Sequence, residues 1–181
     1  MDTNVEGLVM KLASGEWSST TVVEAFMRRG GLAQMLANCV TELLPDRVLK
    51  RAAELDEQFA THKKPIGPLH GLPISVKEHV GIKGLDMNAI FVGWVDNVAE
   101  EDALLLQLLW DAGAVFYVRT TQLRTLMYLE TSSNLYGMLR ETVNPYNTTL
   151  TAGGSSGGEG ALTSLRGAVL GRPTDHAVGS A

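Results

Sequence analysis

The sequence predicts an α/β fold, and three of its features support this. Apolar side chains recur at helical spacing through the first sixty residues. Residues 72–77 alternate with a period of two, and a helical pattern over 100–113 leads directly into a short apolar run at 114–118. Helices followed by a strand, a helix and another strand favour an α/β architecture.

Composition places the chain among soluble globular proteins. The 181 residues fit one domain or a large piece of one, and 45% hydrophobic residues suffice for a core. A net charge of −5 without a basic patch argues against a nucleic-acid partner, and no apolar segment predicts a membrane span or a signal peptide. Cys39 is the single cysteine, which fits a reducing compartment, so we expect a cytoplasmic protein.

Three helices are predicted before residue 64. Capping-box patterns occupy residues 3–6 and 21–24, and Pro45 suits the first position of the third helix. Gly30 and Gly31 weaken the second helix, but its apolar stripe continues to Leu43. The apolar positions are Val5, Leu8, Val9 and Leu12, then Phe26, Met27, Leu32, Leu36, Cys39 and Leu43, then Val48, Ala52, Leu55 and Phe59.

The alternation after residue 71 predicts a strand that carries a lysine. Leu72, Ile74 and Val76 form one face, and Ser75 and Lys77 the other. If both faces are covered, burial favours the neutral amine of Lys77, which can then act as a base near neutral pH. The alternative is a lysine at a strand end that reaches solvent.

Downstream, residues 100–113 predict a helix with acidic residues in its first turn, a buried leucine-rich centre and Gly113 just beyond its end. The run 114–118 predicts a strand. Residues 144–158 predict a long turn-rich loop, and a helix is expected to begin at Glu159. His62, His70 and His79 lack metal-ligand spacing, so no metal site is predicted.

The segment "TAGGSSGGEG" at 151–160 has three readings by itself. A phosphate cradle requires a lysine followed by serine or threonine at the P-loop spacing, which is missing. A nucleophile elbow matches Gly-x-Ser-x-Gly around Ser155, but no strand directly precedes it, and His176 is the only histidine downstream. A flexible linker is the third reading, although a turn and a helix start flank the segment tightly.

Two motifs together closely resemble the amidase signature family: "GPLHGLPISVKEHVGIKG" at 67–84 and "NPYNTTLTAGGSSGGEGAL" at 144–162. The first sixty residues are most similar to the fungal acetamidase branch, in "LASGEWSS" and "LPDRVLKRAAELDE". The resemblance runs from about residue 5 to Gly171. The lysine strand and the glycine-rich loop follow in the family's order, 78 residues apart.

The resemblance implies a Ser-cisSer-Lys triad that hydrolyses a small-molecule amide without a metal or organic cofactor. Lys77 matches the lysine that acts as general base and acid, and Ser155 matches the bridging serine, which relays the proton from a cis peptide. Ser156 matches an accessory residue. Glycines make such a backbone sterically possible. The glycines beside the serine pair are Gly153, Gly154, Gly157 and Gly158.

The family's nucleophile is a third serine, in a Gly-Gly-Ser turn about two dozen residues after the bridging serine. The residue 24 positions after Ser155 is Gly179, and Ser180 follows one residue late. Thr174 and Asp175 match the approach to that turn, but residues 176–178 do not. We therefore expect impaired catalysis, with Ser180 as a displaced candidate nucleophile.

The same resemblance predicts the domain organisation. Residues 1–181 are expected to form the N-terminal part of a single amidase signature domain, so that its mixed sheet is incomplete. Its regions are a helical region (1–64), the lysine strand with the Gly/Ser-rich core (65–171) and a divergent tail (172–181). Residues near Met138 look like an insertion; this and the tail suggest a misread splice boundary or a frameshift as a hypothesis.

Two other functions are compatible with the sequence. A non-catalytic remnant would bind or interfere with a full-length relative. An amidotransferase A-type subunit would generate ammonia within a complex, but the acetamidase-like helices disfavour it. Neither the identity of the amide nor the oligomeric state follows from the sequence, and a homo-oligomer is compatible with it.

Overall fold

A computed structural model describes residues 3–127, 129–133 and 140–172. The helices are α1 (Val5–Ala13), α2 (Ser19–Ala37), α3 (Pro45–His62), α4 (Leu104–Asp111) and α5 (Gly157–Ser164), with 3₁₀ turns η1 (Val92–Trp94) and η2 (Arg124–Leu126). The strands are β1 (Val40–Leu43), β2 (Pro73–Lys77), β3 (Val115–Thr120), β4 (Ser132–Ser133), β5 (Arg140–Glu141), β6 (Val143–Asn144), β7 (Asn147–Thr151) and β8 (Gly171–Arg172). The predicted α/β class is confirmed.

A four-stranded mixed sheet with the order β1-β3-β2-β8 forms the centre of the fold. β2 runs parallel to both β3 and β8, whereas β1 runs antiparallel to β3. The connection from β2 to β3 contains α4, as a parallel pair requires a long crossover. Because β2 lies between two strands and under helices, all five of its residues are buried.

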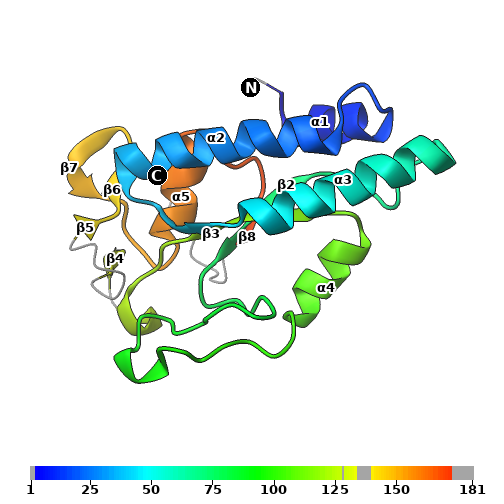
Figure 1. Ribbon diagram of the computed structural model, residues 1–181. Helices are drawn as coiled ribbons and strands as arrows, with labels where there is room; N and C mark the ends of the chain where they lie inside the picture. Colours follow the sequence, from blue (N-terminus) through cyan, green and yellow to red (C-terminus); the bar gives the residue numbers. More distant parts are fainter. Residues whose placement is uncertain (1–2, 128, 134–139, 173–181) are drawn as a thin grey trace.

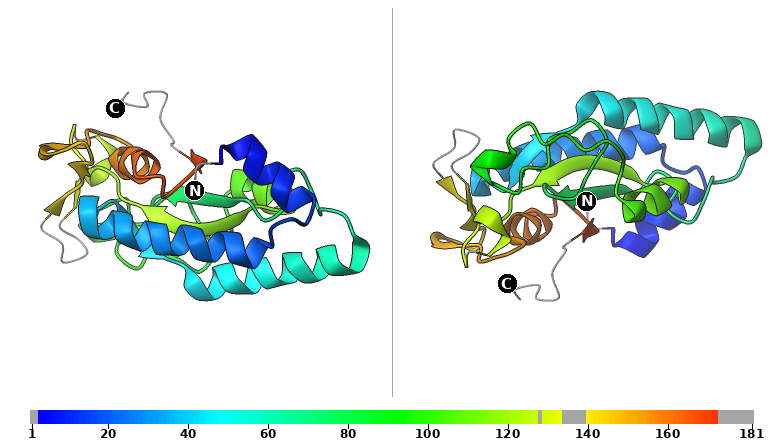
Figure 2. Two further views of the ribbon diagram at one scale, coloured as in Figure 1. Left: turned by 90° about the horizontal axis from the view of Figure 1, so that it is seen from above. Right: turned by 90° about the horizontal axis from the view of Figure 1, so that it is seen from below.

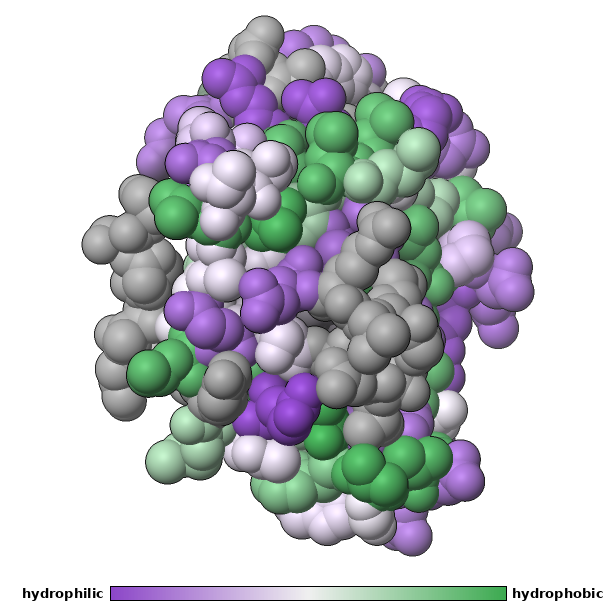
Figure 3. Space-filling view, turned by 90° about the vertical axis from the view of Figure 1, so that its left-hand side faces the viewer, coloured by the Kyte–Doolittle hydropathy of each residue, from purple (hydrophilic) through white to green (hydrophobic). Residues whose placement is uncertain are grey.

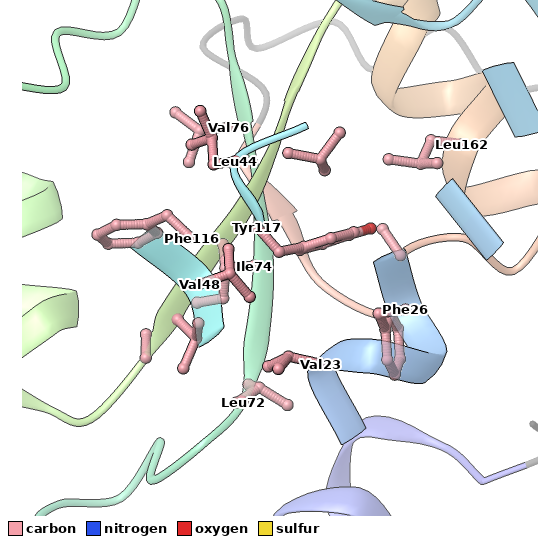
Figure 4. Packing of buried hydrophobic residues seen from close by; sticks show 14 of the residues in the cluster. Val23, Phe26, Leu44, Val48, Leu72, Ile74, Val76, Phe116, Tyr117 and Leu162 are labelled. Carbon is pink, nitrogen blue, oxygen red and sulfur yellow. The ribbon is translucent and has the colours of Figure 1, made fainter. Parts of the chain in front are cut away.

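Helices cover both faces of this sheet (Figures 1 and 2). α2 and α5 lie on one face, and α4 with the segment that precedes it lies on the other. Two neighbouring residues of β3 point to the two faces of the sheet: Tyr117 points toward Phe26 of α2, and Phe116 points to the opposite side (Figure 4). The rings of Tyr117 and Phe26 meet edge to face at 5.9 Å, and Phe116 lies 6.1 Å from the Trp110 ring of α4.

The N-terminal helices begin close to the predicted positions. α1 is capped by Asn4 rather than Thr3, since the Asn4 side chain accepts a hydrogen bond from the Gly7 amide at 2.9 Å. α2 begins earlier than its predicted capping box, because the Ser18 hydroxyl accepts from the Thr21 amide at 3.1 Å. The prediction of Pro45 at the start of α3 is confirmed.

The predicted apolar stripe of the second helix is wrong beyond Met27, which still packs against the core. α2 ends at Ala37, because Asn38 adopts a left-handed conformation with φ of 51°, and Leu43 belongs to strand β1. Leu32 and Leu36 are 53% and 66% exposed. The side of α2 that carries small residues turns inward instead: a Cβ added at Gly30 would make an ordinary van der Waals contact with the Tyr117 ring at 3.6 Å. The buried face of α2 is formed by Ser19, Val22, Val23, Phe26, Gly30, Ala33 and Ala37.

The helix predicted over 100–113 is shorter and only partly buried. α4 begins at Leu104, because Asp102 instead accepts a hydrogen bond from the Lys83 amide at 2.7 Å. Leu106 is buried, but Leu104 and Leu108 are 71% and 59% exposed, so the leucine-rich segment is not wholly core. Gly113 follows the helix with φ of 97°, as predicted.

Strands β1 and β8 and the short pairs β4–β5 and β6–β7 were not predicted. The β6–β7 hairpin occupies part of the segment that the sequence predicted as a loop, and it lies near the end of α2 (Figure 1). On this side of the molecule, apolar patches are separated by hydrophilic residues (Figure 3). No helix in the described ranges has both the length and the apolar character needed to cross a bilayer.

The buried face of α2 can be tested with two truncations on the same helix. Phe26 is 3% exposed and Leu36 is 66% exposed. We expect Phe26→Ala to lower the free energy of unfolding by about 3–5 kcal/mol, because it leaves a cavity beside Tyr117. Leu36→Ala should change it by less than about 0.5 kcal/mol. Urea unfolding of both variants measures the difference, and equal losses would contradict the assigned face.

Candidate active site

The predicted lysine and serine lie in direct contact. Lys77, at the end of β2, has no exposed surface, and its Nζ donates a hydrogen bond to Ser155 Oγ at 2.8 Å. The peptide bond between Gly154 and Ser155 is cis. A lysine that reaches solvent is thereby excluded, and two segments 78 residues apart are joined at one point.

The site lies at the carboxyl ends of the parallel strands, where open α/β sheets bind their ligands. Lys77 is the register partner of Thr120, the last residue of β3. α5 begins at Gly157, two residues after Ser155, and packs against β2 and β3. The strand ends and the helix start therefore bring the lysine and the serine loop together.

Thr131 holds the two ends of the serine loop. Its backbone amide and its hydroxyl both donate to the Gly153 carbonyl, at 3.0 and 2.6 Å, and its hydroxyl oxygen accepts from the Gly157 amide at 3.1 Å. Thr131 is itself fully buried. These contacts fix the loop on both sides of Ser155, so the flexible-linker reading is wrong for this segment.

The four glycines of the loop serve different steric needs. An added Cβ at Gly154 would lie 1.9 Å from Leu123 Cδ2, and one at Gly157 would lie 2.3 Å from Thr131 Oγ1. At Gly158 it would lie 2.5 Å from the Thr121 carbonyl oxygen. Gly153 has open space around it but a φ of 71°, which a side chain disfavours. Three positions therefore require close packing and one requires a left-handed conformation.

Ser156 lies between the loop and the helix, at the N-cap position of α5. Its Oγ is buried and has no hydrogen-bond partner among the residues that the structure describes. The accessory role that the family resemblance assigns to Ser156 stays a prediction.

A buried carboxyl group near the lysine was not predicted. Glu159 is 4% exposed, and its carboxylate accepts hydrogen bonds from Ser75 Oγ at 2.7 Å and from Thr120 Oγ1 at 2.9 Å. Burial raises the pKa of Glu159, while these two hydrogen bonds and the positive charge of Lys77 oppose the rise. The sequence signal that could have identified Glu159 is a single acidic residue where the glycine-rich loop leads into an apolar helix.

Several predicted residues lie outside the described ranges. The candidate nucleophile Ser180, the glycine at the family position (Gly179), Thr174 and Asp175 are among them, as is most of the segment around Met138. Their predictions therefore stay predictions, as does the division of the chain into regions. Within the described residues, no three His, Cys, Asp or Glu side chains form a group that could hold a metal ion.

Comparison with known proteins decides the family. The family model described as Amidase matches residues 21–180. This chain belongs to the amidase family. Two similar members are acetamidases, from Emericella nidulans (49% identical) and Aspergillus oryzae (46% identical). In both cases the match covers 93% of this chain but 30% of the relative, so the chain spans about a third of the length of the curated relatives it matches.

Solved structures of amidases show the same arrangement. A fatty acid amide hydrolase superposes with a TM-score of 0.89 at 41% identity, over 94% of this chain and 29% of that protein. A peptide amidase from Stenotrophomonas maltophilia superposes with a TM-score of 0.80 at 28% identity, over 94% of this chain and 35% of that protein. The α/β architecture described above is thus shared with known amidases.

The close approach of α5 to the sheet can be tested with two glycines of this helix. At Gly158 a methyl group would collide with the Thr121 backbone, whereas at Gly160 it would meet nothing within 4 Å. We expect Gly158→Ala to destabilise the fold by about 1–3 kcal/mol. Gly160→Ala should stabilise it by about 0.5–1 kcal/mol, because alanine favours the helix. Thermal and urea unfolding separate the two outcomes, and a neutral Gly158→Ala would show that the contact is loose.

Proposed function

We propose that this chain forms the lysine and bridging-serine part of an amide hydrolase that cleaves the carbon–nitrogen bond of a small linear amide. The observation that carries the proposal is the 2.8 Å hydrogen bond from the fully buried Lys77 to Ser155. Similarity to two acetamidases supports a short aliphatic amide as the substrate. The buried, unpaired Cys39 supports a reducing compartment, in keeping with the cytoplasm.

In the proposed reaction, a nucleophilic serine gives its proton to Ser155 Oγ while Ser155 passes its own proton to Lys77 Nζ. The serine oxygen attacks the amide carbonyl, the C–N bond breaks, and Lys77 returns a proton through Ser155 to the nitrogen, which leaves as ammonia. Water then attacks the ester, and the same groups carry a proton from the water to the serine. The products are a carboxylic acid and a regenerated serine.

Lys77→Ala tests the proposal, with Lys64→Ala as the matched control. Both remove a lysine amine, but Lys77 is fully buried at the serine contact and Lys64 is exposed. With acetamide as substrate, we expect ammonia release to fall by about 100-fold or more in Lys77→Ala, because the proton acceptor is lost. Lys64→Ala should keep the wild-type rate. Activity that survives in Lys77→Ala would contradict the proposed role of this amine.

The nucleophile itself is tested by a serine-directed fluorophosphonate. We propose that catalysis is impaired because Gly179 occupies the family position of the nucleophile, so Ser180, the displaced candidate, should take up the probe slowly at most, as mass spectrometry can measure. Labelling should be slower in Ser155→Ala, because proton transfer from the nucleophile is interrupted. A folded chain that takes up no label would instead support the non-catalytic alternative, which the glycine at position 179 favours.

A further inference from the structure

Glu159 is a buried carboxyl group that the proposed reaction does not use. It lies in the first turn of α5 and reaches back to the sheet, where the hydroxyls of Ser75 and Thr120 donate to its two carboxylate oxygens. Gly171 of β8 closes the space on another side, since an added Cβ there would lie 2.2 Å from Glu159 Oε2. The carboxylate is therefore held in a fixed place with both oxygens satisfied.

The two hydroxyl donors belong to the strand positions that surround Lys77. Ser75 lies two residues before Lys77 in β2, and so on the same face of the strand. Thr120 is the residue of β3 that pairs with Lys77 in the sheet register. A carboxylate bound by both hydroxyls lies near the lysine side chain, and the charge of Lys77 accordingly acts on Glu159.

Tyr117 and Cys39, two ionisable residues that interact electrostatically with Glu159, stay neutral near neutral pH. Burial raises the pKa of Tyr117 well above its usual value, and its hydroxyl donates to the Gly167 carbonyl. Burial likewise raises the pKa of Cys39 to about 12. The positive charge of Lys77 acts on Glu159 and opposes the rise in its pKa.

We propose that Glu159 is a positioning residue for Lys77. The carboxylate of Glu159 stabilises the ammonium that forms when Lys77 takes the proton of Ser155. The inference rests on the proposed function for its catalytic meaning. The electrostatic pairing itself is a property of the folded chain. A buried ammonium without a counter-charge is unfavourable, and a nearby carboxylate removes much of that penalty. Glu159 transfers no proton in this scheme; it changes the pH at which Lys77 accepts one.

Titration of the Lys77 amine tests this pairing without requiring turnover. In the whole chain with ¹⁵N-labelled lysine, the Nζ resonance of Lys77 is followed against pH and assigned with Lys77→Ala. We expect Glu159→Gln to lower the Lys77 titration midpoint by about 1–2 pH units, because the removed charge no longer favours the ammonium. An unchanged midpoint would overturn the proposal.

Ser75→Ala is the matched control for structural damage. It removes the 2.7 Å hydrogen bond to Glu159 but keeps the carboxylate charge. We expect Ser75→Ala to lower the unfolding temperature. Its Lys77 titration midpoint should nevertheless stay higher than the Lys77 midpoint measured in Glu159→Gln. If the two variants shift the midpoint equally, Glu159 acts through packing and the proposal is wrong.

A variant-free measurement covers the case in which Glu159→Gln does not fold. In wild-type chain labelled with ¹³C-glutamate, the Glu159 carboxyl resonance should show an additional inflection at the Lys77 midpoint, since coupled groups report each other's titration. A single inflection unrelated to Lys77 would overturn the pairing. If the chain hydrolyses acetamide, Glu159→Gln should also move the acidic limb of kcat/KM to lower pH with KM unchanged. A chain without activity would contradict the proposed function, but the titrations of the Lys77 amine and the Glu159 carboxyl group could still be measured.

Discussion

The burial of the Lys77 amine is the constraint on which this arrangement depends. An ammonium or amine without solvent needs polar partners inside the protein, because an unpaired buried charge costs several kcal/mol. Such burial is achieved by placing β2 between β3 and β8, with α2 and α5 on one face and α4 on the other. Ser155 supplies a hydroxyl at 2.8 Å, and Glu159 lies close enough for its charge to be felt.

The serine loop reaches this lysine because its glycines allow close contact. Gly154 leaves room for Leu123, and Gly158 lets α5 pack directly on the backbone of Thr121. Thr131 then ties Gly153 to Gly157 across the loop. The small residues and the threonine act together, since close packing brings the hydroxyls to the strand ends and the hydrogen bonds hold them there.

The residue after Lys77 anchors a second buried network. Glu78 accepts a hydrogen bond from Gln122 and pairs with Arg119, whose guanidinium also contacts Glu42 of β1 and the Asp86 carbonyl. Lys77, the last residue of β2, thus contacts the serine loop, whereas the next residue, Glu78, contacts Arg119 of β3. The Arg119 contacts hold β1 and the segment after β2 in place, which keeps the strand end fixed where the lysine emerges.

The sequence by itself predicted the α/β class, the three N-terminal helices and the lysine strand, whereas the connection of Lys77 with the Gly/Ser-rich loop was implied by the resemblance to the amidase signature family. Those features depend on local periodicity, capping and two distinctive motifs, all of which are readable along the chain. Tertiary structure decided which face of α2 is buried: Phe26 and Gly30 lie on the buried face, whereas Leu32 and Leu36 are exposed. It also decided that β1 pairs with β3 and that β8 pairs with β2, at the two edges of the sheet. The tertiary structure also placed Glu159 beside Ser75 and Thr120. Ser75 is 84 residues and Thr120 is 39 residues from Glu159, so their hydroxyls reach the carboxylate only once the sheet and α5 are packed.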